Sequence, residues 1–412
     1  MQEVAVIFFE KTKPTFGGQR FVLKANFDRV TSSESLQNVA VGGKLTTQKV
    51  FSQAAEGKVY HACNYLSDYV AVTDVGVRYN DGTGDKTVMT EFADNADARL
   101  FFHAESKQLF ATSAANGVCR FDGTASEKVF DKALFGMTSA GYRVCGFNGN
   151  TVYFSDVYAS EFDVDEDGGS ITFDGPVSGI AAANNTLFVF ADDLHAVTFS
   201  ADQKSILAKT VAKNVDNVTQ NPCVVGGSVY FAGRHGLYKL TNNTIRRIAD
   251  DSLFCNVTVA FTVYSDGKLA VYANGDNGGK IYFADTHTDK IVGCVVQRCD
   301  CLFDSFGQLY AVCDNKLLAQ NKASEGRWTG ETSCSAAKRY VRNICIKASG
   351  KVTVKVKTDK MSCAITAECG GKLRKLPVRA FGNTVCLSAT LAAGATLNYL
   401  AAEGFVYRGE KV

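Results

Sequence analysis

Short apolar runs recur along the chain, and each is bounded by Gly, Asn or Asp. Apolar runs of three or four residues closed by turn-forming residues are typical of β-strands, whereas the 3.6-residue period of helices is almost absent. The strongest runs are residues 70–72, 109–111, 152–154, 187–190, 229–231, 269–272 and 309–312. The pattern predicts an all-β protein.

The spacing of these runs predicts a repeat architecture. Their first residues are separated by 39, 43, 35, 42, 40 and 40 positions. In several units a turn dipeptide such as Asn184-Asn185 or Gly226-Gly227 precedes the run, and a second run follows after a short polar gap. This is the pattern of a hairpin, which cannot bury its face alone and must stack on its neighbours. A period of about 40 residues predicts a β-propeller, and seven runs predict about seven blades.

The repeat ends near Trp328, and strict alternation follows at Val352, Val354 and Val356. We therefore expect three parts. Residues 1–50 form an N-terminal strand or arm that could close the propeller, residues 51–328 form the propeller, and residues 329–412 form a small β-sandwich domain.

The chain has 44 basic and 42 acidic residues, a net charge of +2. Such a balance differs from the electrostatic footprint of proteins that grip nucleic acid over a long surface. Lysines gather late in the chain, at Lys351, Lys355, Lys357, Lys360, Lys372 and Lys375. Alternation places the first three opposite the valines, so we interpret them as a solvated strand face.

One acidic segment, Asp163-Val-Asp165-Glu-Asp167-Gly168, is followed by Asp174 eleven positions after its start. Alternate carboxylates closed by a glycine resemble the beginning of a calcium loop, because Ca²⁺ prefers hard oxygen ligands and the glycine permits a sharp turn. Two interpretations are open: a calcium site made by Asp163, Asp165, Asp167 and Asp174, or an acidic turn between two strands. The sequence predicts no other cofactor.

The fourteen cysteines include no Cys-x-x-Cys pair, and none of the five histidines has metal-ligand spacing. We interpret the cysteines as small buried hydrophobes, with a disulfide or a metal site as alternatives. A Cys/His dyad would meet only in space, and no nucleophile elbow, P-loop or dinucleotide-binding pattern occurs in context. We therefore predict that the chain is not an enzyme. Arg246-Arg247 is interpreted as a surface pair, with a phosphate or partner contact as the alternative. No apolar stretch reaches the roughly 18 residues of a membrane span, so we expect no membrane insertion.

Ordered phrases between residues 140 and 250 carry a resemblance to a known family. They are Asn150-Thr-Val-Tyr153-Phe154-Ser155-Asp156, Gly179-Ile-Ala, Asn185-Thr-Leu-Phe-Val-Phe190, Asn221-Pro222, Gly227-Ser-Val-Tyr230-Phe231, Gly236-Leu-Tyr238 and Ile245-Arg246-Arg247-Ile248. In this order the phrases resemble the propeller-bearing nozzle, or tail tubular, proteins of short-tailed bacteriophages, which include the packaged-DNA stabilisation proteins.

The resemblance implies a structural virion protein of the phage tail, made in the host cytoplasm. It implies a homohexameric ring below the portal and adaptor that extends the DNA channel, retains the genome and docks other tail proteins. Its partners would be further copies, the portal or adaptor, other tail proteins and the passing genomic DNA, and no catalytic residues are implied. Two alternatives remain open, a glycan- or receptor-binding propeller of the tail and a propeller glycosidase.

Overall fold

The computed structural model describes residues 19–27, 36–66, 68–80, 84–157, 162, 168–199 and 206–407, and strands dominate throughout. The chain divides into two compact units. Unit 1 consists of Met1–Val50, Ile291–Val296 and Lys322–Val412, and unit 2 consists of Phe51–Lys290 and Gln297–Asn321. Among the described residues no helix is long and apolar enough to cross a membrane.

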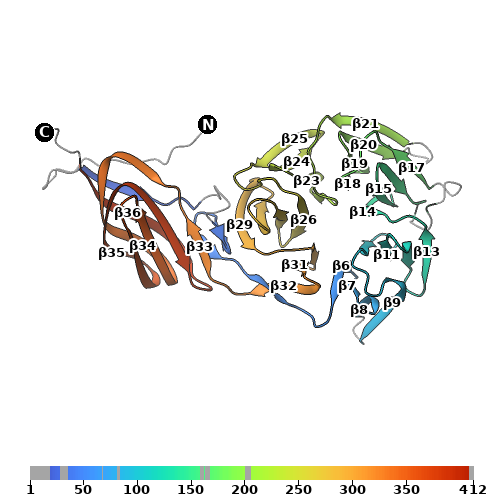
Figure 1. Cartoon of the computed structure of the whole chain (residues 1–412), viewed down its shortest axis with the longest axis horizontal. Coiled ribbons are helices and arrows are strands. Elements are labelled where there is room, and N and C mark those ends of the chain that lie inside the picture. Colours follow the sequence, from blue (N-terminus) through green and yellow to red (C-terminus); the bar gives the residue numbers. More distant parts are fainter. Residues whose placement is uncertain are drawn as a thin grey trace. The chain divides into compact units, whose positions relative to one another are not determined.

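Unit 2 is built from four-stranded sheets that follow one another along the chain (Figure 1). The first three sheets are β6 (Val59–Tyr65), β7 (Asp68–Thr73), β8 (Gly76–Asn80) and β9 (Asp85–Met89); β10 (Arg99–His103), β11 (Gln108–Ser113), β12 (Gly117–Phe121) and β13 (Ser126–Phe130); and β14 (Phe135–Ala140), β15 (Arg143–Asn148), β16 (Thr151–Phe154) and β17 (Gly169–Thr172). A short 3₁₀ helix, Thr90–Phe92, lies between the first two sheets.

The other three sheets continue the same order. They are β18 (Gly179–Ala183), β19 (Thr186–Phe190), β20 (Leu194–Phe199) and β21 (Ile206–Ala212); β22 (Cys223–Val225), β23 (Ser228–Gly233), β24 (Gly236–Thr241) and β25 (Thr244–Ala249); and β30 (Cys301–Ser305), β31 (Gln308–Cys313), β32 (Lys316–Lys322) and β5 (Val50–Gln53). The last sheet joins a strand from the start of unit 2 to three from its end, a device that closes propellers.

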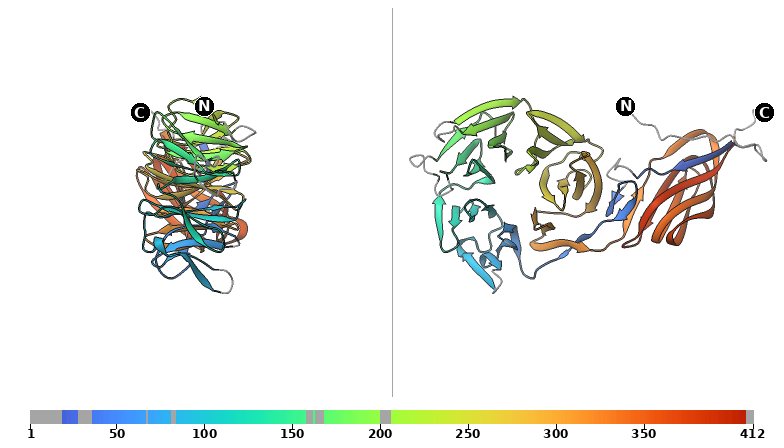
Figure 2. Two further views of the ribbon diagram at one scale, coloured as in Figure 1. Left: turned by 90° about the vertical axis from the view of Figure 1, so that its right-hand side faces the viewer. Right: turned by 180° about the vertical axis from the view of Figure 1, so that it is seen from behind.

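The first strands of the sheets form a closed circuit. Strand β6 contacts β10, and the contacts then run through β14, β18 and β22 in turn, while β30 contacts β6. Strand β26 (Val259–Ser265) contacts both β22 and β30 and pairs with β27 (Lys268–Asn274), which pairs with β28 (Lys280–Asp285). The right-hand view of Figure 2, from behind the view of Figure 1, shows the sheets of unit 2 arranged around a ring. The all-β propeller prediction is confirmed.

The predicted number of about seven blades is corrected to six four-stranded blades. The spacing of apolar runs counts repeats of sequence, and the repeat around Leu269 contributes β26, β27 and β28 without forming a separate four-stranded sheet. The count of repeats therefore exceeds the count of closed blades.

Apolar side chains pack between consecutive sheets. Phe190 on β19 and Phe231 on β23 are buried, and their ring centroids lie 4.7 Å apart. The turns use residues that tolerate a left-handed backbone: Asn184 and Asn185, between β18 and β19, have φ of 51° and 59°. Two positive φ values in a two-residue loop match the twist of antiparallel strands, which explains the dipeptides seen in the sequence.

Unit 1 contains a sheet with the strand order β2 (Leu36–Gln37), β33 (Gly326–Thr329), β35 (Ser362–Leu391), β34 (Ser333–Thr358), β36 (Thr396–Tyr407), β4 (Leu45–Thr47), β3 (Val39–Ala40) and β29 (Lys290–Val296). Strand β1 (Gln19–Lys24) also pairs with β36. The described part of the predicted arm, residues 1–50, therefore belongs to unit 1 except at its end, where β5 enters the last sheet of unit 2. The predicted sandwich of residues 329–412 corresponds to long strands in this hydrogen-bonded sheet.

Candidate functional site

The predicted calcium loop lies mostly outside the described residues, since Asp163, Asp165 and Asp167 are not among them. Asp174 is exposed in the connection between β17 and β18. The neighbouring Gly175 lies against Asp192, because a Cβ at Gly175 would stand 2.4 Å from the Asp192 Oδ2. The calcium site therefore stays a prediction.

Another group of possible metal ligands lies elsewhere in the propeller. One ligand atom each from Asp300, Cys313 and Asp314 lies within 4.8 Å of the others. The Asp314 amide donates to the Asp300 Oδ2 at 3.1 Å, which accounts for one carboxylate without an ion. Burial raises the pKa of the Cys313 thiol to about 11, so the thiol is protonated at neutral pH. A protonated thiol beside exposed carboxylates makes a weak ligand set.

All fourteen cysteines are free thiols, and eight of them are buried. The burial of these eight fits their interpretation as small hydrophobes. One of them meets a histidine: the Cys301 Sγ lies 3.5 Å from the His61 Nε2, and the His61 Nδ1 accepts from the Leu100 amide at 3.4 Å.

The ionisation of this Cys/His pair is opposite to that of a nucleophilic dyad. Burial lowers the pKa of His61 to about 3, with a smaller contribution from the positive charge of Arg99. Burial also raises the pKa of Cys301 to about 11. A nucleophilic dyad needs a thiolate next to an imidazolium, whereas here both groups are neutral at pH 7. The geometry favours a packing contact between β6 and β30.

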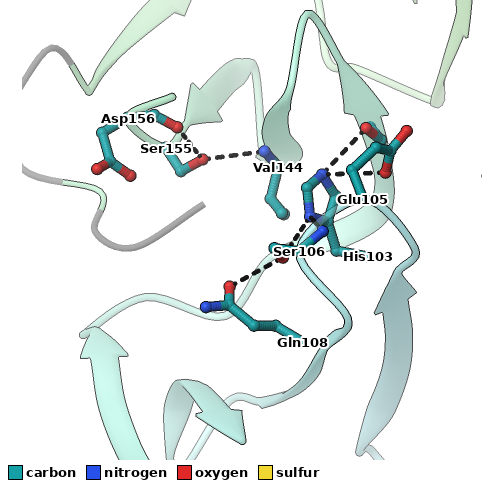
Figure 3. Close-up of polar contacts among 8 residues, drawn as sticks. His103, Glu105, Ser106, Gln108, Val144, Ser155 and Asp156 are labelled. Atoms are coloured by element: carbon teal, nitrogen blue, oxygen red, sulfur yellow. Dashed lines mark hydrogen bonds and ion pairs between the residues drawn. The ribbon is translucent and has the colours of Figure 1, made fainter. Parts of the chain in front are cut away.

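A second histidine lies in a polar network at the turn after β10 (Figure 3). The His103 side chain is fully buried, with Nδ1 2.6 Å from the Ser106 Oγ and Nε2 3.1 Å from the Ser139 Oγ. The Ser106 amide points at Nδ1 from 3.3 Å, and Glu105 Oε2 lies 3.3 Å from Nε2. These partners fit a neutral imidazole that accepts at Nδ1 and donates at Nε2.

The His103 network ties neighbouring sheets together. Ser139 belongs to β14, so the ring joins the turn after β10 to the first strand of the next sheet. Burial lowers the pKa of His103 against the opposing effect of Glu105. The single proton of the Ser106 hydroxyl can go either to the His103 Nδ1 or to the Gln108 Oε1, 3.1 Å away. Both ring nitrogens have hydrogen-bonding partners, one in the turn and one on β14, which is what a structural lock requires.

Arg143 is a buried cation in the propeller. Its side chain is fully buried, and its guanidinium carbon lies 5.7 Å from the ring centroid of Phe154 and 5.3 Å from that of Phe199. Its Nη1 donates to the Ser155 carbonyl oxygen at 2.5 Å. Phe199 comes from the next sheet, so this arginine bridges two blades.

Arg246 and Arg247 take part in ion pairs within the propeller. Arg246 pairs with Asp289, which Lys239 also contacts at 3.1 Å, and Arg247 lies 3.6 Å from Asp251. These pairs agree with the interpretation of the arginines as surface residues.

The two units carry opposite net charges, which the whole-chain total conceals. Unit 1 contains 23 Lys and Arg against 10 Asp and Glu, a net charge of +13. Unit 2 contains 21 Lys and Arg against 32 Asp and Glu, a net charge of −11. The two values add to the chain's +2. Charges counted separately for the parts predicted from the sequence would already have indicated this segregation.

The negative charge of unit 2 gathers at one end of its sheets. In each antiparallel sheet, the loop between the second and third strands and the connections to the neighbouring sheets lie at the same end. We call these segments the connection face. They hold fifteen acidic residues and five basic ones. The acidic residues are Glu56, Asp74, Glu91, Asp94, Asp97, Asp131, Asp174, Asp192, Asp193, Asp216, Asp250, Asp251, Asp276, Asp300 and Asp314, and all except Asp193 are exposed.

The positive charge of unit 1 is concentrated on β34 and β35. Lys347, Lys351, Lys355 and Lys357 are exposed, and they share one face of β34 because they stand at odd-numbered positions. The even-numbered Val352, Val354 and Val356 are buried on the other face. We call the four lysines the lysine row. The prediction of an alternating lysine face is confirmed for the residues around the valines.

No model of a known protein family matches the chain, and no curated protein matches it. Among solved structures, the chain is similar to the β-propeller domain of Cps50 (Swd1) from Myceliophteria thermophila, at 8% identity and a TM-score of 0.48. The match covers 67% of this chain and 100% of the other. A likeness at this level transfers neither function nor partners.

Proposed function

We propose that the chain is a structural protein that assembles with further copies of itself, as a nozzle or head-to-tail ring component of a bacteriophage tail. The observation that carries this proposal is the opposite charge of the two units, +13 and −11. Unlike charges on two parts of one chain allow the basic part of one copy to attract the acidic part of the next. Contacts between different patches of identical subunits are heterologous, and they generate closed rings when the rotation closes.

The propeller suits such a role. Its sheets form a closed circuit with loops at both ends, so it offers a rigid body with two separate faces for neighbours. The buried His103 and Arg143 join adjacent blades and strengthen this body rather than serving a reaction. The role is non-enzymatic: the ring surrounds and retains genomic DNA and contacts the portal or adaptor and other tail proteins within the virion.

The ordered phrases between residues 140 and 250 support the assignment to a tail. Two of them, Asn185-Thr-Leu-Phe-Val-Phe190 and Gly227-Ser-Val-Tyr230-Phe231, overlap β19 and β23, the second strands of consecutive blades. Their order goes beyond what a β-propeller requires. The fold determines which strand positions are buried, but it requires neither Asn221-Pro222 before β22 nor Gly-Leu-Tyr at the beginning of β24.

The proposal is tested with the purified full-length chain and with virus particles. Native mass spectrometry and negative-stain images should show closed rings of identical subunits, and peptides of the chain should be found in purified particles. A strict monomer at about 100 μM, combined with absence from particles, would contradict the proposal. Rings without any presence in particles would retain self-assembly and remove the tail assignment.

A further inference from the structure

We infer that the lysine row of unit 1 docks onto the connection face of unit 2 in a second copy of the chain. The inference rests on the proposed function, because it names the two surfaces through which copies would associate. Charge complementarity carries the inference. The lysine row consists of four exposed lysines, whereas the connection face has fifteen acidic residues and five basic ones.

Three of the four lysines form a regular basic strip. At about 3.3 Å per residue, the six residue steps from Lys351 to Lys357 extend over roughly 20 Å. Lys347 lies beyond Gly350, whose φ of 79° interrupts the regular strand. Among the described residues, these four lysines take part in no ion pair or side-chain hydrogen bond. Their charges are therefore available to a partner.

The strands beside the row add little negative charge. Lys355 lies opposite Ala364 and Ser388, and Lys357 lies opposite Ser362 and Cys386. Between the lysines, the hydroxyls of Thr353 and Thr366 contact each other at 2.9 Å. The only carboxylate opposite the row in this register is Glu368, across from Lys351. Small polar neighbours leave the ammonium groups as the dominant feature of the face.

The connection face supplies the complementary charge. Its excess of ten acidic residues accounts for nearly all of the −11 of unit 2. Lys58 pairs with Asp94 and Arg234 with Asp216, so two of the five basic residues already have partners there. Many of the carboxylates therefore remain available to an external cation.

A second copy fits this arrangement better than a nucleic acid does. A polyanion drawn to the lysine row would be repelled by a propeller of charge −11 in the same chain. A second copy supplies an acidic connection face for the lysine row of the first. Its own lysine row can in turn bind the connection face of a further copy. One repeated heterologous contact then places the lysine row of each copy against the connection face of the next.

The experiment uses the full-length chain in sedimentation velocity at about 50 mM and 500 mM NaCl. Because surface charges are screened within roughly 10 Å at 0.1 M salt, the apparent dissociation constant between copies should rise at least about tenfold at the higher salt. A row variant, Lys351→Glu with Lys355→Glu and Lys357→Glu, should dissociate to monomers. A face variant, Asp74→Lys with Asp174→Lys and Asp192→Lys, should also dissociate.

Mixing the two variants provides the decisive measurement. Each variant keeps one native surface, so the intact connection face of the row variant can bind the intact lysine row of the face variant, and the mixture should form a complex that neither variant forms alone. A matched control, Lys209→Glu with Lys268→Glu and Lys290→Glu, changes the net charge by the same amount on exposed residues outside both surfaces. This control should assemble like the unmodified chain. Circular dichroism verifies that all variants are folded.

The outcomes separate the inference from the proposed function. Rings that survive the row and face reversals would overturn the docking inference and leave self-assembly standing. A monomeric unmodified chain that is absent from particles would remove the proposed function and the inference with it. Folded variants that fail to assemble when mixed would also overturn the inference. Tight binding of a labelled 30-base-pair duplex to the monomer, abolished in the row variant, would assign the row to nucleic acid instead.

Discussion

The Nε2 of His61 lies 3.5 Å from the Sγ of Cys301, across the boundary between β6 and β30. These strands belong to the sheets where the circuit of blades closes. Burial disfavours the charged form of both groups, lowering the pKa of His61 to about 3 and raising that of Cys301 to about 11. The contact therefore contributes to closure of the propeller in its neutral form, and acid should weaken it.

The first prediction concerns the pH dependence of stability. Because the pKa of His61 falls from 6.5 in the unfolded chain to about 3 in the folded one, the unfolded state binds the extra proton first. The contribution of His61 is complete above pH 6.5 and is lost as the pH falls toward 3. As the pH falls from 6 to 4, the unfolding free energy of the unmodified chain should decrease by about 1 kcal/mol per pH unit more than that of the His61→Gln variant. Urea unfolding across this range measures the difference.

A comparison variant isolates this effect from other acid-sensitive groups. Several carboxylates also have lowered pKa values, such as Asp122, whose pKa falls to about 2 through hydrogen bonds from Ala125 and Thr124. Their contribution is the same in both chains and cancels in the difference. Identical pH profiles for the unmodified chain and His61→Gln would show that the histidine is charged in the folded state.

The second prediction concerns thiol reactivity. Burial raises the pKa of Cys145 and of Cys223 to about 12, some three units above the ordinary value, which reduces their thiolate fraction roughly a thousandfold. Cys334 is the one exposed cysteine. A disulfide reagent at pH 8 should therefore modify Cys334 first, and Cys334→Ser should remove the fast phase. Fast labelling of Cys145 in the folded chain, detected by peptide mass spectrometry, would contradict this burial.

Much of the propeller could be predicted from apolar runs because each run marks a buried strand. Six of the seven runs lie on the second strand of their group, for example residues 187–190 on β19 and 229–231 on β23. The run at 152–154 lies on β16, the third strand of its sheet, which shifts the apparent spacing on either side to 43 and 35. The repeat period can therefore be recognised although one of the seven runs lies on a different strand of its sheet.

The charged surfaces could not be predicted from the total charge, because +13 and −11 nearly cancel. The lysine row was visible in the alternation around Val354, but its significance depends on the acidic loops far away in the sequence. Contacts such as His61 with Cys301, 240 positions apart, follow from closure of the circuit and leave no local pattern.

The third prediction concerns the buried Arg143. Replacement by Ala removes contacts with the rings of Phe154 and Phe199 and leaves the Ser155 carbonyl without the Nη1 donor. We expect Arg143→Ala to lower the unfolding free energy by about 3 kcal/mol. Arg234, 71% exposed and 3.8 Å from Asp216, provides the control, and Arg234→Ala should change stability by less than about 0.5 kcal/mol. Similar losses for both variants in urea unfolding would show that the burial of Arg143 contributes little.

The fourth prediction concerns a strained turn. Phe306 and Gly307 connect β30 to β31, Ser305 lies opposite Gln308, and both loop residues have positive φ, 51° and 80°. This is the geometry of a type I′ turn, which favours Asn-Gly. Phe306 is 73% exposed, so little burial offsets the left-handed backbone.

Replacing Phe306 by Asn creates the favoured pair and should raise the unfolding free energy by about 1 kcal/mol, because the left-handed region costs a phenylalanine roughly that much more. Phe306→Ala separates strain from exposure: it removes the exposed ring and keeps a Cβ at φ 51°, so it should leave stability nearly unchanged. Urea unfolding of the three chains at pH 7 measures both differences. If Phe306→Asn and Phe306→Ala both lost stability by the same amount, the aromatic ring itself would be what holds the turn in place.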